Sequence, residues 1–199
     1  MMATIDPLMI ELPATLPSER LLMRAPRAGD GAALNDAMVE SLESLKPWMP
    51  WAQKMPTPEE SELTCRQIAL RFAQRSDLTL YMFERGAEGA CGGLVGGTGL
   101  HRMDWNVPRF EIGYWCRPSM QGRGLVTEAV QTLARFAFDA LRARRVEVRM
   151  SSINTKSRAV AERCGFTLEG VLRQDSLDVN GQPRDTVVYA RVRGVEEPA

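Results

Sequence analysis

The sequence predicts a single domain of the α/β (α+β) class, with a mixed, mostly antiparallel sheet of six to seven strands flanked by about four helices. Three observations support this fold class. The 199 residues suit one domain, which by the usual scaling buries roughly 70% of its unfolded surface. Segments with helical spacing of apolar residues are interspersed with short apolar runs that are typical of strands. Two pairs of such runs enclose turn-rich segments, as antiparallel hairpins do.

The first half of the chain is predicted to hold one strand, two helices and a hairpin. Residues 21–25 have the pattern of a strand, and Asp30 is placed to cap a helix that continues to about Leu45. Residues 57–60, Thr-Pro-Glu-Glu, have the pattern of a capping box with proline at the first helical position, so a second helix is expected to about Arg75. The hairpin strands are expected over residues 78–84 and 92–101, around a turn-rich segment at 86–90.

The second half is predicted to hold four strands and two helices. Its long helix is indicated by apolar residues that recur at helical spacing, so that one face is apolar. The short helix is expected to begin after Asn154, which can cap it, and to end before Gly165. Asn180 and Gly181 indicate a turn between the last two strands. The strands are predicted over residues 109–116, 146–150, 166–173 and 186–193, and the long helix over 127–141.

The folded domain is expected to span residues 19–194, with a flexible tail at 1–18 and a loose C-terminus at 195–199. The first 17 residues contain acidic but no basic side chains and no unbroken apolar core, so a signal peptide is not expected. The cysteines lie far apart and form no CxxC pair, which favours a reduced, cytoplasmic setting. They are Cys65, Cys91, Cys116 and Cys164.

The charges and motifs argue against several classes of function. The 25 Lys and Arg residues balance 25 Asp and Glu residues, and they are scattered, so we expect no binding to nucleic acid. No apolar run approaches transmembrane length, so we expect no membrane span. His101 is the single histidine. Because neither HExxH nor GxSxG occurs, we expect no metal site and no hydrolase triad.

Residues 118–126, Pro-Ser-Met-Gln-Gly-Arg-Gly-Leu-Val, are the most informative segment of the chain. Gly122 and Gly124 permit a tight turn, so the backbone N–H groups of residues 122–126 can point outward together. The loop directly precedes the long helix, where unpaired N–H groups carry the positive end of the helix dipole and favour an anion of pyrophosphate type. The loop lacks the third glycine of a dinucleotide fingerprint and the Lys-Ser or Lys-Thr of a P-loop.

This loop resembles the acetyl-CoA signature of the GNAT acetyltransferase superfamily, which is Gln or Arg, two residues, Gly, one residue, then Gly or Ala. The signature corresponds here to Gln121, Gly124 and Val126, so its last position departs from the pattern, although the backbone N–H remains. From about Leu21 to Arg193 the order of segments is similar to the Rim-type (RimJ/RimL-like) branch, the ribosomal-protein N-terminal acetyltransferases. The segments are Lys46-Pro47-Trp48-Met49-Pro50-Trp51, Glu111-Ile112-Gly113-Tyr114-Trp115, Asn154-Thr155-Lys156-Ser157 and Gly165-Phe166-Thr167-Leu168-Glu169-Gly170.

The resemblance implies a GNAT-like domain and an acetyl-CoA-dependent N-acetyltransferase, which moves an acetyl group to a primary amine by direct attack in a ternary complex. Acetyl-CoA is the expected cosubstrate, and the N-terminal α-amine of a protein, of ribosomal-protein type, is the expected acceptor. A homodimer is also compatible with it. A small-molecule amine, such as an antibiotic, a polyamine or an amino-acid derivative, is the alternative acceptor. The alternatives of another class are a non-catalytic acyl-CoA-binding sensor and a nucleotide-binding protein that uses the same loop.

The resemblance further implies that the donor lies between the strands at 111–116 and 146–150. Its pantetheine arm would bond backbone groups near Trp115 and Cys116, where an N–H could polarise the thioester oxygen. Cys116 has no partner histidine in sequence, so a buried structural role is expected for its thiol. The expected cofactor-binding residues are Trp115, Cys116, Gln121, Gly122, Arg123, Gly124, Leu125, Val126, Asn154 and Ser157.

Glu111 is the first candidate for the general base, acting directly or through a water, although Arg109 is close enough in sequence to pair with it instead. Asp175 and Asp178 are rival bases. The resemblance implies that Ser157 meets the departing sulfur, and a hydrogen bond suffices there because a thiol has a pKa of roughly 8.5. Ordinary helix capping is the alternative reading of the same segment.

The resemblance implies that the tryptophan-containing segment at 46–51 lines the acceptor site, as the corresponding segment does in similar proteins. Core anchoring is the alternative for tryptophans flanked by prolines. An α-amine with a pKa near 8 is roughly ten to twenty per cent neutral at pH 7.2, whereas a lysine amine is under about 0.1% neutral, so a weak base fits an N-terminal acceptor better. The expected acceptor-binding residues are Trp48, Trp51 and His101, with Met49, Trp105 and Asn106 as neighbours.

Overall fold

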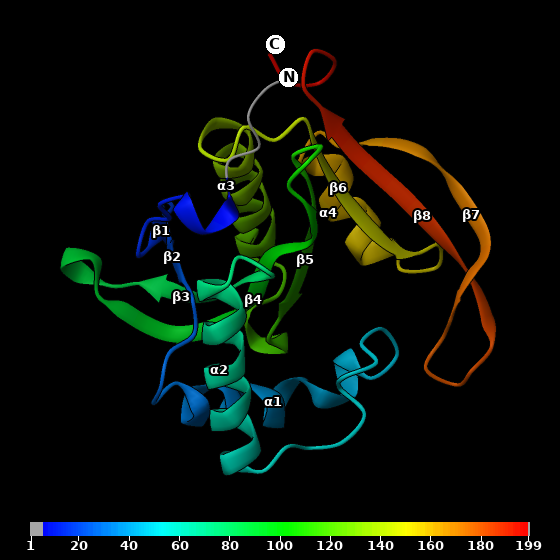
Figure 1. Ribbon diagram of the computed structural model, residues 1–199. Helices are drawn as coiled ribbons and strands as arrows, with labels where there is room; N and C mark the ends of the chain where they lie inside the picture. Colours follow the sequence, from blue (N-terminus) through cyan, green and yellow to red (C-terminus); the bar gives the residue numbers. More distant parts are fainter. Residues whose placement is uncertain (1–5, 199) are drawn as a thin grey trace.

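The computed structural model describes residues 6–198, with the backbone alone for Glu88. One sheet has the strand order β1-β2-β3-β4-β5-β6-β8-β7 and is antiparallel at every pair except β5 with β6 (Figure 1). The fold class is confirmed. The sheet has eight strands instead of six to seven, because the two-residue β1 has no sequence pattern of its own. The strands are β1 (Leu16–Pro17), β2 (Leu21–Arg24), β3 (Leu78–Arg85), β4 (Cys91–Asp104), β5 (Arg109–Cys116), β6 (Arg145–Ser151), β7 (Thr167–Leu177) and β8 (Pro183–Val192).

Helices cover both faces of the sheet (Figure 1). α3 and α4 pack on one face, where the core includes Leu80, Met82 and Phe110. α1 and α2 pack on the other face, where Tyr81 and Phe83 are buried. Successive β3 residues therefore point into opposite cores, as the pleat of a strand requires. The helices are α1 (Gly31–Leu45), α2 (Pro58–Ala73), α3 (Leu125–Asp139) and α4 (Thr155–Arg163), with short 3-10 helices η1 (Pro7–Met9), η2 (Ala87–Gly89) and η3 (Pro118–Met120).

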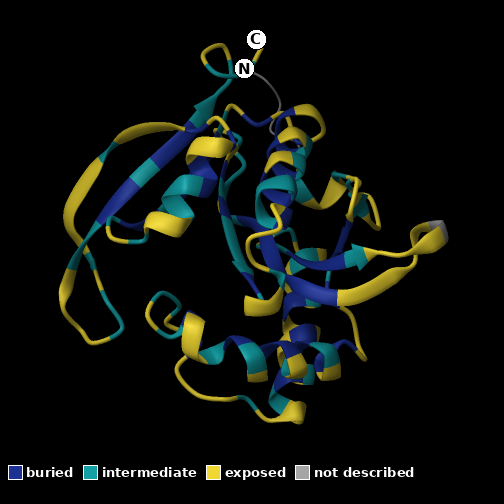
Figure 2. Cartoon of the chain, turned by 180° about the vertical axis from the view of Figure 1, so that it is seen from behind, coloured by how far each residue is buried: buried dark blue, intermediate teal, exposed yellow. Residues whose placement is uncertain are grey.

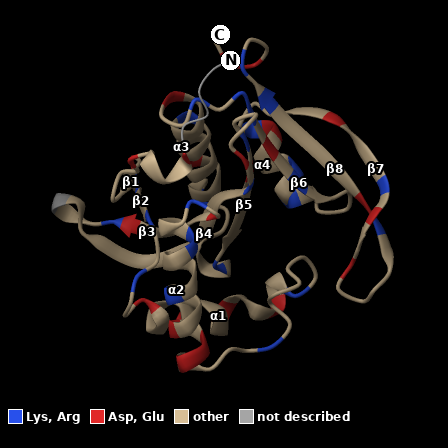
Figure 3. Ribbon diagram, viewed as in Figure 1, with Lys and Arg blue, Asp and Glu red and all other residues tan. Residues whose placement is uncertain are grey.

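Charged positions of both signs are distributed over the helices, strands and loops (Figure 3). β7, at the edge of the sheet, is exposed along most of its length, whereas the inner strands are buried (Figure 2). Within the described part of the chain, no helix is both long enough and apolar enough to cross a bilayer.

The capping box of α2 is confirmed. Thr57 Oγ1 accepts a hydrogen bond from the Glu60 N–H at 3.1 Å, and Glu60 Oε2 accepts one from the Thr57 N–H at 2.9 Å. Pro58 at the first helical position has no N–H to satisfy. The helix ends at Ala73, before the predicted Arg75, because Arg75 has a left-handed φ of 58° that interrupts helical geometry.

Asp30 precedes α1 as predicted, but its side chain does not cap the helix. Its carboxylate accepts two hydrogen bonds from Arg24, at 2.6 and 2.8 Å, and one from the Arg27 N–H at 2.8 Å. Glu62 of α2 takes the capping role, since its carboxylate accepts from the Gly31 N–H at 3.1 Å. The prediction that the Asp30 side chain caps α1 is therefore wrong, because a buried arginine is a stronger partner for a carboxylate than a helix amide.

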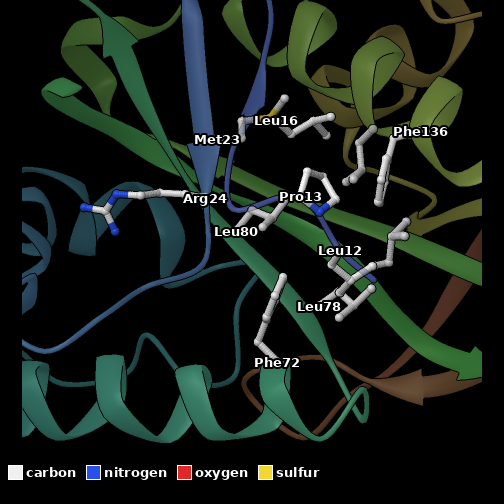
Figure 4. A pocket seen from close by; sticks show the side chains of 11 residues that line it. Leu12, Pro13, Leu16, Met23, Arg24, Phe72, Leu78, Leu80 and Phe136 are labelled. Carbon is white, nitrogen blue, oxygen red and sulfur yellow. The ribbon is translucent and has the colours of Figure 1, made fainter. Parts of the chain in front are cut away.

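Residues 6–18, which the sequence predicts to be a flexible tail, contact the folded domain. β1 pairs with β2, and the apolar side chains of Ile10, Leu12 and Leu16 pack against the core under α3. Arg75 anchors the segment by donating to the Ile10 carbonyl oxygen at 3.1 Å. Leu12, Pro13 and Leu16 also cover a small apolar cavity over β2 and β3, where Arg24 points away from the other lining side chains (Figure 4). Partial burial of Ile10, Leu12 and Leu16 stabilises these contacts.

The C-terminus is also anchored where it is described. Glu197 forms an isolated β-bridge with Arg193, and its carboxylate contacts the guanidinium of Arg191. Glu197, within the end that is expected to be loose, thus contacts β8 and the residue that follows it. Residues 1–5 and 199 of the two predicted ends lie outside the described residues.

The β7–β8 hairpin extends further than predicted. Its strands pair as far as Leu177 with Pro183, beyond the predicted limits of 173 and 186. Asp178 closes the turn, since its Oδ1 accepts from the N–H groups of Asn180 and Gln182 at 2.8 Å each. Gly181 has a left-handed φ of 77°, which confirms the turn expected there.

Replacing Asp30 tests the buried ion pair. Asp30→Asn should lower the free energy of unfolding by about 3 kcal/mol, because Arg24 is left buried without its carboxylate. Burial alone would raise the pKa of Asp30, but Arg24 and Arg27 hold that pKa below its usual value. The stabilisation should therefore be present at neutral pH and be lost as the pH falls through the lowered pKa.

Urea denaturation followed by circular dichroism measures this effect. Asp36→Asn, at an exposed position of the same helix, is the matched control and should change the free energy of unfolding by less than about 0.5 kcal/mol. Equal stability of the two variants would show that the ion pair does not hold the start of α1.

Candidate functional site

The site begins where two central strands part. β5 and β6 pair in parallel at only three positions, Arg109 with Arg145, Phe110 with Val146 and Glu111 with Glu147. Beyond Glu111, β5 continues along β4 and β6 continues along β8, and the two strands diverge (Figure 1). Their facing backbone edges can therefore bond an extended ligand, in the gap that the resemblance implies.

The loop at the end of β5 presents unpaired backbone amides. Gly122 and Gly124 have left-handed φ values of 75° and 77°, and α3 begins directly after Gly124. Within residues 6–198, the N–H groups from Gly122 to Thr127 donate to no protein oxygen, and the first helical bond is from Glu128 to the Gly124 carbonyl at 3.1 Å. A Cβ at Gly122 would meet nothing within 4 Å. The loop is thus an open cradle at the positive end of a helix, suited to an anion.

Polar side chains hold this loop in place. Gln121 Nε2 donates to the Cys116 carbonyl at 3.3 Å, which ties the loop to the end of β5. Glu40 of α1 accepts from the Ser119 N–H and from Arg117 Nε, the latter at 2.8 Å. The Ser119 backbone, with Arg117, holds the pKa of Glu40 below its usual value. Sequence reasoning missed Glu40, because it stands within an ordinary helical pattern.

The predicted cradle residues differ in their surroundings. Val126 is half-buried and packs against the core, so its bulk lies away from the loop opening. Leu125 is buried in the same core. Arg123 is half-exposed and contacts Glu84 at 3.4 Å, so its guanidinium already has one acidic neighbour.

α4 faces the gap from the other side. Asn154 caps the helix as expected, because its Oδ1 accepts from the Ser157 N–H at 3.1 Å. The Ser157 carbonyl accepts from the Tyr114 hydroxyl at 2.9 Å. Burial raises the pKa of Tyr114 above its usual range. Tyr114 thus joins β5 to α4 across the gap, a role with no signal in its surrounding sequence.

On the other face of β4 and β5, the rings of Trp115 and His101 lie over glycine residues. A Cβ at Gly97 would lie 2.4 Å from Trp115 Nε1. A Cβ at Gly113 would lie 2.9 Å from His101 Cδ2, and one at Gly99 would lie 3.0 Å from His101 Cε1. Glycine is therefore required at these positions for the rings to lie against the sheet.

One predicted acceptor residue extends this face. Trp51, which is 56% exposed, meets Trp115 edge to face with ring centroids 6.2 Å apart. Trp48 lies in the same connection between α1 and α2 and is half-buried. The expected placement of Trp105 beside them is wrong, because its ring packs on Phe110 at 5.1 Å, in the core on the α3 side.

Glu111 lies on the same face as the two rings and is opposite His101 in the β4–β5 register. Its side chain is 16% exposed, and within residues 6–198 its Oε2 is buried without a hydrogen bond. Arg102 Nε lies 3.5 Å from that oxygen, at a distance for charge attraction but without hydrogen-bond geometry. Burial raises the pKa of Glu111, and the opposing charge of Arg102 does not cancel the shift.

The alternative acids are engaged elsewhere. Arg109, considered as a partner for Glu111, instead lies 3.9 Å from Asp104. Asp175 pairs with Arg149 at 3.1 Å, and Asp178 closes the hairpin turn. Glu111 is thus the candidate base with a buried, unbonded carboxylate oxygen.

Cys116 has the environment of a structural residue. It is buried, its thiol donates weakly to the Arg117 carbonyl at 3.5 Å, and burial raises its pKa to about 11. Such a thiol is protonated at neutral pH and a poor nucleophile. Across the described chain, no group of three or more His, Cys, Asp or Glu residues is placed to hold a metal ion.

Comparisons with known proteins agree with this geometry. The "Acetyltransferase (GNAT) domain" family matches residues 20–167. The Bacillus subtilis (strain 168) protein named "Putative ribosomal N-acetyltransferase YdaF" is 32% identical over 176 residues, which cover 88% of this chain and 93% of that protein. The Escherichia coli (strain K12) "Ribosomal-protein-serine acetyltransferase" is 30% identical over 142 residues, 71% of this chain and 75% of that protein.

Solved structures show the same fold. The structure of RimL, described as a ribosomal L7/L12 alpha-N-protein acetyltransferase in complex with coenzyme A, has a TM-score of 0.80 at 26% identity, over 89% of this chain and 97% of that one. The self-immunity acetyltransferase MccE, solved with acetyl-CoA and AMP, also has a TM-score of 0.80, at 24% identity over 88% of this chain and 94% of that one. The chain therefore belongs to the GNAT family of acetyltransferases, as its sequence predicted.

Proposed function

We propose that this protein transfers the acetyl group of acetyl-CoA to the N-terminal α-amine of a protein, in a ternary complex. The observation that carries the proposal is the buried, unbonded carboxylate of Glu111 at the point where β5 leaves β6. It is supported by the E. coli relative, named a ribosomal-protein-serine acetyltransferase, and by RimL, named for L7/L12. A ribosomal protein is accordingly the first acceptor to test.

The gap and the cradle together fit the shape of acetyl-CoA. The backbone N–H groups from Gly122 to Val126 would hold the pyrophosphate at the start of α3. The pantetheine arm would then extend along the free edge of β5, bonding backbone groups near Trp115 and Cys116. The thioester would then lie near Glu111, and a backbone N–H of β5 could stabilise the charge that develops on its oxygen.

Glu111 is suited to receive a proton from an α-ammonium group. Because burial raises its pKa, its basicity is closer to that of an amine with a pKa near 8 than an exposed glutamate would be. A lysine ammonium, with a pKa near 10.4, would be harder for the same group to deprotonate. The environment of Glu111 therefore favours an N-terminal acceptor over a lysine side chain.

Ser157 is suited to meet the leaving sulfur. It lies in the first turn of α4, on the far side of the gap from β5. A thiolate with a pKa of roughly 8.5 is a good leaving group, so a hydrogen bond from the hydroxyl is sufficient. The edge-to-face pair of Trp51 and Trp115 would form the apolar wall of the acceptor site.

The acceptor can be identified by measuring release of free CoA with paired substrates. One peptide has a free α-amine and no lysine, and its partner has a blocked α-amine and one lysine; small amines complete the panel, with product masses checked. Acetylation of the free α-amine supports the proposal. Turnover of small amines alone would instead indicate a metabolite or drug acetyltransferase. Binding of acetyl-CoA without any turnover would indicate a sensor.

Gly124→Val should weaken acetyl-CoA binding at least about tenfold. A branched side chain at a φ of 77° costs about 1–3 kcal/mol and distorts the cradle. Gly181→Val has the same φ of 77° in the β7–β8 turn and is the matched control, which should lose stability but keep its affinity. Isothermal titration with acetyl-CoA measures both. Equal affinities would remove the loop from the donor site.

Glu111→Gln should lower kcat about 100-fold, because glutamine cannot accept the proton, while the Kd for acetyl-CoA stays the same. In the wild type, kcat should rise with pH as Glu111 deprotonates, through a range above the usual glutamate pKa because its pKa is raised. This rise should be absent in the glutamine variant. Glu19→Gln, at an exposed position, is the control, and an unaltered kcat in Glu111→Gln would exclude Glu111 as the base.

Trp51→Ala should raise the KM for the peptide acceptor by about 3- to 10-fold, since the aromatic contact is worth about 0.5–1.5 kcal/mol. The affinity for acetyl-CoA should not change. Leu63→Ala removes an equally exposed apolar side chain, 55% against 56%, from α2 and should leave both constants unchanged. An unchanged acceptor KM in Trp51→Ala would place the acceptor elsewhere.

A further inference from the structure

His101 and Asp77 form a hydrogen-bonded pair beside Glu111. His101 Nδ1 lies 2.7 Å from Asp77 Oδ2, and the two side chains are 30% and 24% exposed. Asp77 follows α2 and is fixed by Thr79, whose N–H donates to Asp77 Oδ1 at 3.1 Å and whose hydroxyl donates to the same oxygen. The carboxylate is thus held in place by residues outside β4, and it sets the orientation of the imidazole.

This hydrogen bond determines which nitrogen of His101 can take a proton. A carboxylate only accepts hydrogen bonds, so Nδ1 carries the hydrogen and Nε2 of the neutral ring carries the lone pair. Burial alone would raise the pKa of Asp77, but the hydrogen bond and charge of His101 outweigh burial and lower it. Asp77 is therefore held in its ionised form, as an acceptor for the Nδ1 hydrogen.

The imidazole neighbours Glu111 across the β4–β5 pair. Its Nε2 would be 3.0 Å from a Cβ at Gly113, so this nitrogen is over the β5 residue two positions beyond Glu111. Among the described residues, Nε2 has no hydrogen-bond partner. Residues opposite one another in neighbouring strands have Cβ atoms about 5 Å apart, and His101 is opposite Glu111. His101 is also the more exposed of the two, 30% against 16%.

Each turnover leaves a proton that the buried carboxylate must lose. The ammonium gives one proton to Glu111, and the amine nitrogen forms a bond to the carbonyl carbon. The C–S bond then breaks, and the thiolate takes the second proton as the amide forms. The products are the acetylated amine, CoA with a free thiol, and one proton on Glu111. Glu111 must release this proton before it can act again.

We propose that His101, oriented by Asp77, relays this proton from Glu111 to solvent through Nε2. The relay rests on the proposed acetyl transfer. It makes Asp77 a positioning residue that acts through His101, and it differs from the expectation that His101 binds the acceptor. Arg102, Arg149 and Glu147 are charged groups that act on Glu111. The charge of Arg71 acts on Asp77.

Chemical rescue distinguishes a proton relay from a structural role. In weak buffer, His101→Ala should lower kcat about 100-fold, with the Kd for acetyl-CoA and the KM for the peptide acceptor unchanged. Added imidazole should restore kcat in proportion to its concentration, because it can carry the proton in place of the missing ring. Asp77→Asn should also lower kcat, and Asp36→Asn, on the exposed face of α1, should not. Imidazole should not rescue Glu111→Gln.

The outcomes separate the relay from the proposed function. A wild-type kcat in His101→Ala, or a raised acceptor KM without imidazole rescue, would overturn the relay while leaving acetyl transfer intact. A wild-type protein that acetylates no amine would overturn both. An unchanged Kd for acetyl-CoA shows that each variant is folded, so a loss of kcat can be assigned to proton transfer.

Discussion

The rest of the site depends on the short parallel contact between β5 and β6, which ends at Glu111 and Glu147. Two central strands that part leave unpaired peptide groups in the middle of a sheet, where they would be costly without a partner. Here the free edges lie next to the equally unpaired amides at the start of α3. The separation of β5 from β6 thus provides both backbone groups that can bond an extended ligand and, at the end of β5, an anion site.

Successive side chains of β5 point to opposite faces of the sheet, and the two faces have different roles. Tyr114 points towards α4 and supports the donor side, while Glu111 and Trp115 point to the opposite face. Gly113, between them, has no side chain and leaves room for the imidazole of His101. The backbone of β5 can therefore bond the donor while the side chains of Glu111 and Trp115 face the acceptor. Donor and acceptor then do not compete for the same position.

Features with local signals could be predicted from the sequence. The capping box at Thr57 and the left-handed turn at Gly124 depend on neighbours in the chain, and both have the expected form. Contacts between distant segments could not be predicted in this way. Asp30 has the position of a helix cap but pairs with a buried arginine, and Asp77 has no motif around it. Trp105 turns to the opposite core because a strand bulge precedes it.

The hydrogen bond from Tyr114 to the Ser157 carbonyl spans the base of the gap. It sets the spacing between the strand that would hold the donor and the helix that carries the serine, and this spacing exists without any ligand. A preformed frame loses little conformational entropy when it is filled. A gap of fixed width also favours ligands that match that width. The protein can therefore select a donor by the width of its pantetheine arm as well as by the charge of its pyrophosphate.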